Sequence, residues 1–329
     1  MGGSPGKTGT MSQVTGVTGG ILPTAVPPAQ GGRKATPRSG KVRQRKITPY
    51  LFLLAPLALL ITFSYVPAAN LIWYSFTSWD GIDQTKKLVG IQNYIDIFTR
   101  PEIFRVFFVS LYYIAASFLQ MAFALYFATI LSFSTRFRNL FKGILFFPTL
   151  INGVAIGLMF LYFFQPHGTM DSLMKAVGAQ QFTTQWLGNP DAVNVSLAST
   201  SVWRYTGLNF VLFLGAIQSI PSQLYEAADL DGASKFQQFR YIIAPGIKRI
   251  ISLSFILALS GSLAVFEIPY IMTGGANGSS TFVIETIQRA FTFRQVGLAS
   301  AMAVVLLIIV LVVTFIQRRL VPDEEVTLS

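Results

Sequence analysis

Long apolar runs separated by short polar segments make up most of the sequence from residue 47 onward. An α-helix of about twenty apolar residues crosses a hydrocarbon layer of roughly 30 Å, and six of the runs reach that length. The runs show no strand-length alternation, and lipid cannot satisfy the backbone of an open strand. We therefore predict six membrane-spanning helices, at about 47–76, 104–133, 140–164, 195–220, 250–271 and 297–316.

The two ends of the chain differ from this apolar body. Residues 1–46 hold ten glycines, five prolines, eight cations and no acid, and no apolar period runs through them. Such a composition predicts a disordered basic cytoplasmic tail near the membrane surface, and not a cleaved secretory signal. We expect a transmembrane domain over 47–320 and a short cytoplasmic tail over 321–329.

Composition supports this interpretation. The chain is 52% hydrophobic and 12% charged, whereas a soluble domain has about 25% charged residues. A net charge of +11 is also typical of nucleic-acid-binding proteins, but here the cations stand at the ends of the apolar runs. The absence of cysteine excludes disulfides and thiolate metal sites. The single histidine, His167, is expected in a surface turn, and no metal site is predicted.

The distribution of Lys and Arg predicts an orientation. If the amino terminus is inside, the inner segments hold seventeen of these cations and the outer segments hold seven, while Arg204 lies within the fourth run. Because cytoplasmic loops carry the excess of Lys and Arg, both termini are predicted to be cytoplasmic. The loop between the fourth and fifth runs, residues 221–249, is then cytoplasmic as well.

This loop contains an acidic, alanine-rich stretch, YEAADLDGAS. Ser222 suits the N-cap of a first short helix, and Gly232 suits the left-handed residue that ends it. Ser234 and Gln237 predict a capping box for a second helix, which Pro245 is expected to stop. An exposed pair of helices of this kind indicates either a docking surface for a partner or an ordinary interfacial loop.

The stretch EAADLDGASKFQQFRYIIAP resembles the signature loop of permease subunits of binding-protein-dependent ATP-binding cassette importers. The family pattern is Glu-Ala-Ala-x-x-x-Gly followed by Ile-x-x-Pro. Glu226 begins this pattern, Gly232 continues it and Ile242 opens its last part. The chain itself holds no complete nucleotide-binding loop, because MGGSPGKT at the amino terminus resembles only the end of one.

Other stretches are similar to the carbohydrate branch of that family, and in particular to the maltose-type larger permease. They are GLNFVLFLGAIQSIPSQLYEAADLDGA, FEIPYIMTGGANGSST and VGIQNYIDIF, and the resemblance covers about 47–320. The chain departs from the family pattern at Glu267, where an Asp is usual, and it lacks a large inserted outer domain. The resemblance implies an all-α polytopic membrane protein of the MetI-like, maltose-permease type, with a cytoplasmic coupling-helix loop.

The resemblance also implies a function. The chain would be the permease subunit that moves a sugar or oligosaccharide across the bacterial cytoplasmic membrane by ATP-driven alternating access. Its partners would be a second permease, two ATPase subunits and an extracytoplasmic binding protein. ATP and Mg would bind to the ATPase, and this chain would be no enzyme and hold no cofactor. The loop would dock into a cleft of the ATPase through Tyr225, Glu226, Ala227, Ala228, Asp229, Gly232 and Ala233.

Polar residues within the fourth and fifth runs are the candidates for a substrate pathway. Tyr205 and Asn209 are four residues apart and share a helix face, and a sugar needs both aromatic planes and polar groups. The predicted pathway residues are Trp203, Arg204, Tyr205, Asn209, Ser260, Ser262, Phe266 and Glu267. We expect Ser260 and Glu267 to share one helix face and Ser262 and Phe266 another. The alternative is that Arg204 pairs with Glu267 or extends to a membrane surface.

Several alternatives stay open at this point. If Arg204 faces the pathway, an acidic saccharide or a glycerol-phosphate-like solute is favoured as the substrate. A stand-alone secondary carrier would leave the acidic loop unexplained, and a membrane enzyme would need clustered carboxylates or histidines. In the outer loops, Asp80, Gly81, Asp83 and Gly90 and the TGGANGSST stretch are expected to form turns, with contact to a binding protein as the alternative.

Overall fold

The computed structural model of the chain describes residues 41–133 and 138–320. The described residues fall into two units, which are divided between residues 57 and 58. Across the described ranges the structure is helical, with one isolated antiparallel bridge between Thr77 and Leu88 and no strand. The predicted all-α class is therefore confirmed. The predicted tails lie largely outside the described residues, although the first described helix begins at Lys41, before the predicted boundary at residue 47.

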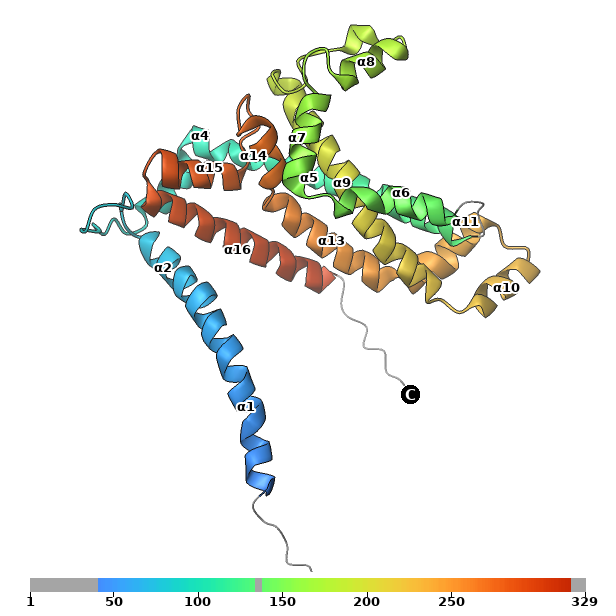
Figure 1. Cartoon of the computed structure of the whole chain (residues 1–329), viewed down its shortest axis with the longest axis horizontal. Helices are drawn as coiled ribbons and strands as arrows, with labels where there is room; N and C mark the ends of the chain where they lie inside the picture. Colours follow the sequence, from blue (N-terminus) through green and yellow to red (C-terminus); the bar gives the residue numbers. More distant parts are fainter. Residues whose placement is uncertain (1–40, 134–137, 321–329) are drawn as a thin grey trace, which may run out of the picture. The chain divides into compact units, whose positions relative to one another are not determined.

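The helices follow the predicted apolar runs in order along the chain, and Figure 1 colours them by their position in the sequence. The first run forms α1 (Lys41–Leu60), the π-helix η1 (Ile61–Tyr65) and α2 (Val66–Tyr74). After an outer loop come α3 (Gln92–Thr99), α4 (Pro101–Phe104) and α5 (Val106–Ser132). The next elements are α6 (Arg138–Leu150), α7 (Gly153–Phe163), α8 (Thr169–Ala176), the short 3-10 helix η2 (Gln180–Phe182) and α9 (Pro190–Gln218).

The loop after α9 and the last two runs complete the order. The loop contains α10 (Ser222–Leu230), α11 (Lys235–Gln238), the π-helix η3 (Phe239–Ile243) and α12 (Ala244–Gly246). The remaining elements are α13 (Lys248–Leu263), α14 (Glu267–Thr273), α15 (Phe282–Ile287), the π-helix η4 (Gln288–Thr292) and α16 (Val296–Leu320).

The third run is not the single helix that its length predicted. It forms α6 and α7, which are bent by 99° at the break between them. The break is local chemistry: Pro148 lies in the last turn of α6, and the Asn152 side chain caps α7 by accepting from Val154 N at 2.8 Å. An apolar run predicts burial or lipid contact, but it does not predict whether the helix is straight. The hydropathy pattern therefore gave no sign of the bend.

Four helical stretches in the described residues are long and apolar enough to cross a membrane, or up to five if α6 and α7 form one span. They are Tyr50–Tyr74, Pro101–Ser132, Lys248–Thr273 and Val296–Arg319. Helix α9 has 29 residues but does not reach the same apolarity, because serine, threonine, asparagine and Arg204 interrupt it. The predicted count of six spans therefore stays a prediction.

Helix α5 is central to the packing of residues 58–329 (Figure 1). Its first turns pack with α3, α15 and α16 around Phe282 and Met302, and its middle packs with α7, α9 and α14 around Tyr113 and Leu197. Its last turns pack with α9 and η3 around Phe210. Three core clusters thus lie along one helix, which fixes the positions of the elements that surround it.

The contact between α6 and α9 is unusually close because α9 has a glycine there. A Cβ atom at Gly207 would overlap the carbonyl oxygen of Leu145 and lie 2.8 Å from Thr149 Oγ1. The Thr149 hydroxyl also donates to the carbonyl oxygen of Arg204 at 3.2 Å. Small residues let helix backbones approach in this way inside membranes.

Candidate functional site

A cavity of about 460 Å³ lies between α5, α9, α13 and residues 264–268. Its lining combines aromatic rings, amides, hydroxyls and one carboxylate with apolar side chains. This volume and this mixture are typical of small-molecule sites, in which a few polar groups orient a ligand in an apolar surround. The cavity is therefore the candidate substrate site of the described chain.

Five of the eight predicted pathway residues line this cavity. Tyr205 and Asn209 lie on the face of α9 that the spacing predicted, and the others come from the end of the fifth run. The five are Tyr205, Asn209, Ser262, Phe266 and Glu267. Their presence together shows that the fourth and fifth runs do enclose one space.

The other three predicted residues lie elsewhere. Trp203 packs edge-on against Phe160 of α7, with ring centroids 5.2 Å apart. Ser260 is half-buried on α13 and is not among the lining residues. Arg204 is also outside the lining, because its guanidinium is held in an ion pair.

That ion pair joins two elements far apart in the sequence. Arg204 Nη1 donates to Glu267 Oε2 at 2.7 Å, and the Arg204 and Glu267 side chains are 14% and 41% exposed. Gly153, at the start of α7, makes room for the pair, since a Cβ atom there would overlap both charged groups. Of the three roles that the sequence left open for Arg204, which were lining the pathway, pairing with Glu267 and extending to a membrane surface, the structure shows the pairing.

The fifth run is interrupted where it borders the cavity. Helix α13 ends at Leu263 and α14 begins at Glu267, so the predicted sharing of faces by Ser260 with Glu267 and by Ser262 with Phe266 is wrong. The carbonyl oxygen of Val265, freed by the break, accepts a hydrogen bond from Thr281 Oγ1 at 2.8 Å. Non-helical backbone at membrane depth is tolerated where it borders such a cavity and its polar groups are satisfied.

Sequence reasoning missed the contribution of α5. Tyr113, Ser117 and Gln120 line the cavity, together with Ser201 of α9 and Ser254 of α13. The spacing of four and then three residues places the three α5 side chains on one helix face, so a polar stripe in the second apolar run was the available signal. Tyr113 is 3% exposed, and its hydroxyl has no hydrogen-bond partner among the described residues.

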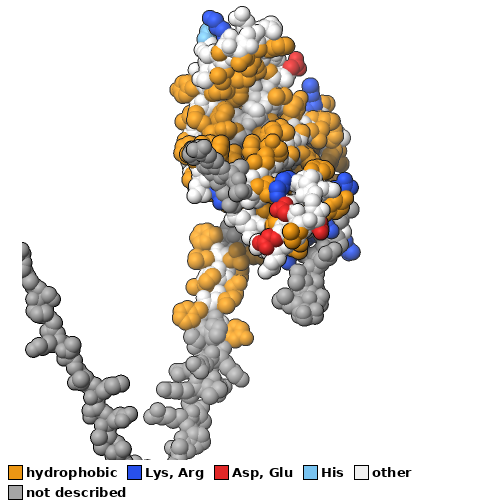
Figure 2. Space-filling model, turned by 90° about the vertical axis from the view of Figure 1, so that its right-hand side faces the viewer, with side chains coloured by type: hydrophobic (Ala, Val, Ile, Leu, Met, Phe, Trp, Pro, Cys, Tyr) orange, Lys and Arg blue, Asp and Glu red, His pale blue; other side chains and the backbone are white. Residues whose placement is uncertain are grey.

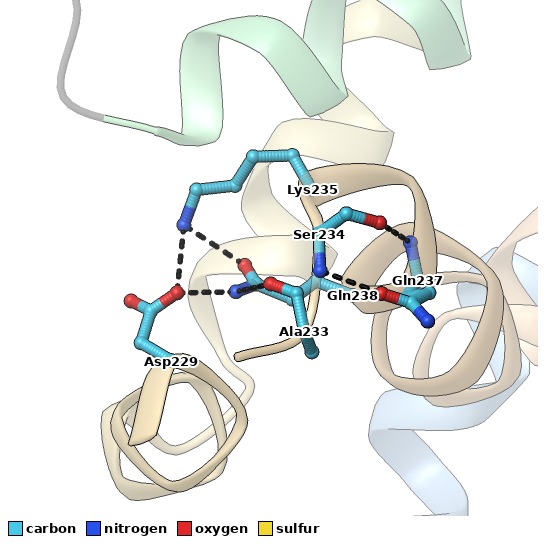
Figure 3. Close-up of polar contacts among 6 residues, drawn as sticks. All are labelled: Asp229, Ala233, Ser234, Lys235, Gln237 and Gln238. Carbon is cyan, nitrogen blue, oxygen red and sulfur yellow. Dashed lines mark hydrogen bonds and ion pairs between the residues drawn. The ribbon is translucent and has the colours of Figure 1, made fainter. Parts of the chain in front are cut away.

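The loop after α9 is a second candidate site, and a buried amide fixes its shape (Figure 3). Gln238 is 1% exposed, and its side-chain Nε2 donates to Asp229 Oδ1 and, at 3.3 Å, to the carbonyl oxygen of Ala233. Lys235 Nζ donates to Asp229 Oδ1 and to Gln238 Oε1, each at 3.1 Å. Hydrogen bonds from Lys235 and Gln238 hold the pKa of the Asp229 carboxyl below its usual value. Asp229 thus ties α10 to α11, a role that the sequence did not predict.

The predicted ends of these short helices are mostly confirmed. Gly232 has a φ of +74°, and Ser234 and Gln237 form the predicted capping box. Two details were wrong. The N-cap of α10 is Pro221, and Ser222 is already the first helical residue. Pro245 lies inside α12, because the wider turn of η3 before it lets the helical path continue to Gly246.

The outward surface of the loop carries the remaining charges. Glu226, Ala227 and Asp231 are exposed, whereas Tyr225 packs inward against the cluster around Phe210, where burial raises the pKa of its phenol. Figure 2 looks at the end that carries this loop and shows acidic and basic side chains gathered there beside hydrophobic ones. The loop is therefore a knob with an exposed charged surface.

Both candidate sites are connected by continuous helices. Helix α9 lines the cavity with Asn209 and ends at Gln218, just before the loop. Helix α13 begins at Lys248, directly after the loop, and lines the cavity with Ser254 and Ser262. A displacement of the loop can thus reach the cavity through the two long helices that flank it.

A Gln238→Ala variant tests the fixed shape of the loop. Removing the buried amide leaves Asp229 with one donor fewer, so we expect amide hydrogen exchange over α10 to rise about tenfold, or by about 1.4 kcal/mol of local stability. Gln223→Ala, an exposed position on α10, is the control and should leave exchange unchanged. Mass spectrometry of the full chain in lipid nanodiscs measures both, and equal exchange in the two variants would contradict this role.

The remaining predictions from the sequence are turns in the outer loops. Asp80 Oδ1 accepts from the backbone N–H groups of Ile82 and Asp83, at 3.0 and 2.9 Å, which forms the predicted outer turn. These hydrogen bonds lower the pKa of the Asp80 carboxyl. The TGGANGSST stretch is also a turn, with Gly274, Gly275 and Asn277 at positive φ, and His167 lies in a turn at φ +61°. The described residues contain no group of three or more acidic, histidine or cysteine side chains that could hold a metal ion.

The cavity and the exposed loop, which two long helices join, lie mostly within a part of the chain that matches a known family of membrane proteins. The family model for the binding-protein-dependent transport system inner membrane component matches residues 120–325, which include the loop and most of the cavity. The chain belongs to this family. It is therefore a multi-pass membrane protein and the permease subunit of an importer that works with a binding protein, and in this family ATP hydrolysis belongs to separate subunits.

Two relatives match this permease over most of its length. The probable ABC transporter permease protein YurN of Bacillus subtilis is 34% identical over 284 residues, which cover 84% of this chain and 97% of the relative. The multiple sugar-binding transport system permease protein MsmF of Streptococcus mutans is 30% identical over 280 residues, covering 84% and 96%. The permease thus shares nearly its whole transmembrane part with such subunits.

The fold is also that of a solved importer. A chain of a bacterial ABC transporter involved in the import of the acidic polysaccharide alginate superposes with a TM-score of 0.73 at 22% identity, covering 87% of this permease and 100% of that chain. This likeness confirms the predicted importer-permease fold.

Proposed function

We propose that this permease moves a saccharide, delivered by an extracytoplasmic binding protein, through the cavity between α5, α9 and α13. The observation that carries the proposal is the cavity lining, where Tyr205 and Phe266 offer aromatic surfaces and Gln120 and Asn209 offer amides. Saccharides expose both apolar ring faces and hydroxyl groups, so this combination suits them. The name of MsmF, a multiple sugar-binding permease, supports the same class.

The buried hydroxyl of Tyr113 adds to this proposal. A buried polar group without a partner costs about 1–3 kcal/mol, and native proteins hold few of them. Tyr113 lines the cavity and its hydroxyl has no partner among the described residues. Neighbouring side chains cover this hydroxyl, and a saccharide whose binding exposes it to the cavity would supply that partner.

The proposed assembly follows from the loop. The exposed surface of α10 would dock onto an ATPase subunit through Glu226, Ala227 and Ala228, and a second permease with its own loop would engage a second ATPase subunit. ATP and Mg would bind to those subunits. Closure of the ATPase pair would move the loop, and α9 and α13 would carry the movement to the cavity, giving alternating access. The excess of cations on this side supports a cytoplasmic loop and cytoplasmic termini.

A Tyr113→Phe variant tests the saccharide site. We expect its saccharide affinity to fall about tenfold, because one hydrogen bond to the substrate is lost. The thermal stability of the variant should be equal or higher, since no existing hydrogen bond within the described chain is removed. The measurement is ATP-dependent uptake of labelled saccharides by liposomes that hold the complete importer and its binding protein.

The matched control is Tyr112→Phe, which removes a hydroxyl from the neighbouring, exposed tyrosine and should leave uptake unchanged. If Tyr113→Phe and Tyr112→Phe take up saccharide equally well, the assignment of Tyr113 is wrong. If the purified chain moves solute without any ATPase subunit, the proposed importer mechanism fails.

A further inference from the structure

The proposed saccharide cavity has a charge arrangement that bears on which saccharides it accepts. Glu267 lines the cavity and its side chain is 41% exposed, whereas Arg204 is outside the lining and 14% exposed. The two are joined by the 2.7 Å contact between Nη1 and Oε2. A substrate in the cavity therefore contacts the Glu267 carboxylate, and the positive charge of Arg204 is compensated by that same carboxylate.

The rest of the lining offers no positive charge. None of the described residues that line the cavity is Lys, Arg or His, and its other polar groups are uncharged hydroxyls and amides. An anionic substrate would lose its hydration, find no cation, and stand near the Glu267 carboxylate in a medium of low dielectric constant. Each of these effects disfavours uronates and phosphorylated sugars.

The arginine is fixed beside the cavity by its surroundings, behind residues that line it. Its guanidinium carbon lies 5.1 Å from the centroid of the Tyr205 ring, and Gly153 packs directly over the ion pair. A cationic substrate gains little either, because Arg204 already compensates the Glu267 charge. The pair is thus neutral as a unit and presents only its acidic side to the cavity.

We infer that the cavity selects uncharged saccharides and rejects anionic ones. Glu267 is the specificity-determining residue, and Arg204 is the positioning residue that holds it. This inference rests on the proposed saccharide function and deepens it, because it decides between the neutral and acidic substrates that the sequence left open.

The test is equilibrium dialysis with the purified importer complex in lipid nanodiscs, without the binding protein, so that only the selectivity of the complex is measured. The probes are labelled neutral gluco-, galacto- and manno-oligosaccharides and the uronates made from them by oxidation of their primary alcohols. The two members of each pair have the same sugar skeleton, and a carboxylate replaces the primary alcohol in the uronate. We expect the neutral member of the pair that binds best to bind at least about tenfold more tightly than its uronate.

Variants at the ion pair separate the specificity role from a merely structural one. Glu267→Gln leaves the Arg204 charge unpaired beside the cavity, and the neutral-over-uronate ratio should fall about tenfold or invert. The double variant Arg204→Gln, Glu267→Gln removes both charges and should give an intermediate ratio. Loss of packing alone would weaken both members of a pair alike and leave the ratio unchanged.

The outcomes distinguish this inference from the function on which it rests. A uronate that binds the wild-type complex as tightly as its neutral partner overturns the inference and leaves the saccharide function standing. The inference is also overturned if the neutral-over-uronate ratio is the same in the wild type and in the double variant. This second comparison does not depend on whether Glu267→Gln alone folds. If no saccharide of either kind binds, the proposed function itself is wrong.

Discussion

A Glu226→Lys variant is expected to insert and fold normally but to lose attachment of the ATPase subunits, and with it ATP-driven uptake. Glu226 is exposed on α10 and forms no ion pair within the described chain, so its charge is free for a partner, unlike that of Asp229. Loss of one partner of a buried interfacial charge pair costs about 2–5 kcal/mol. The affinity for the ATPase subunit should therefore fall by about 30-fold or more. Co-purification of the subunits and uptake by liposomes measure the two effects.

The matched control is Asp231→Lys, which makes the same change of charge in the same loop. Asp231 is the exposed C-cap of α10, where a cation also suits the helix dipole. We expect this variant to keep ATPase attachment and most of the uptake. Equal attachment in wild type and Glu226→Lys, or equal loss in both variants, would show that the docking surface lies elsewhere.

A Gly207→Ala variant is expected to lose about 1–3 kcal/mol of stability from the addition of a single methyl group. The new Cβ would overlap the backbone carbonyl oxygen of Leu145, and a carbonyl in a helix cannot turn aside as a flexible side chain can. Helices α6 and α9 must therefore move apart, which also strains the hydrogen bond from Thr149 to the carbonyl of Arg204. Thermal unfolding of the purified chain, followed by circular dichroism, measures the loss.

Gly215→Ala in the same helix is the control with the opposite expected sign. A Cβ atom at Gly215 meets nothing within 4 Å, so the substitution adds helix propensity of about 1 kcal/mol without a clash. The melting temperature should rise or stay equal in this variant and fall in Gly207→Ala. The same change in both would mean that α6 and α9 are not in close contact.

The turn and the capping box in the loop after α9 were predicted correctly from sequence because short-range chemistry fixes them. The left-handed turn at Gly232 and the capping box of Ser234 and Gln237 each depend on residues within three positions of one another. The helices themselves follow from apolar runs, since lipid leaves the backbone no other regular solution. The all-α class and the position of the knob between two long helices could therefore be predicted from the sequence.

The cavity required the tertiary structure. Tyr205 and Asn209 could be placed on one face of α9 by spacing, but which helices that face meets depends on packing around α5. The stripe of Tyr113, Ser117 and Gln120 was visible in the sequence, yet nothing local says that it borders a space and not another helix. The bend of 99° between α6 and α7 likewise depends on how the two helices pack as well as on Pro148 and Asn152.

The sequence by itself determined the apolar helical segments, the turn at Gly232, the capping box of Ser234 and Gln237 and the exposed acidic loop, because these depend on neighbours along the chain and on the solvent around it. The tertiary structure alone decided that Arg204 is paired with Glu267, 63 residues away, and that Gly153 leaves room for the pair. It also decided that Asp229 is bound by Gln238 within the loop, which leaves Glu226 for a partner. A charge can be recognised in a sequence, but its partner depends on long-range packing, and the partner decides what the charge does.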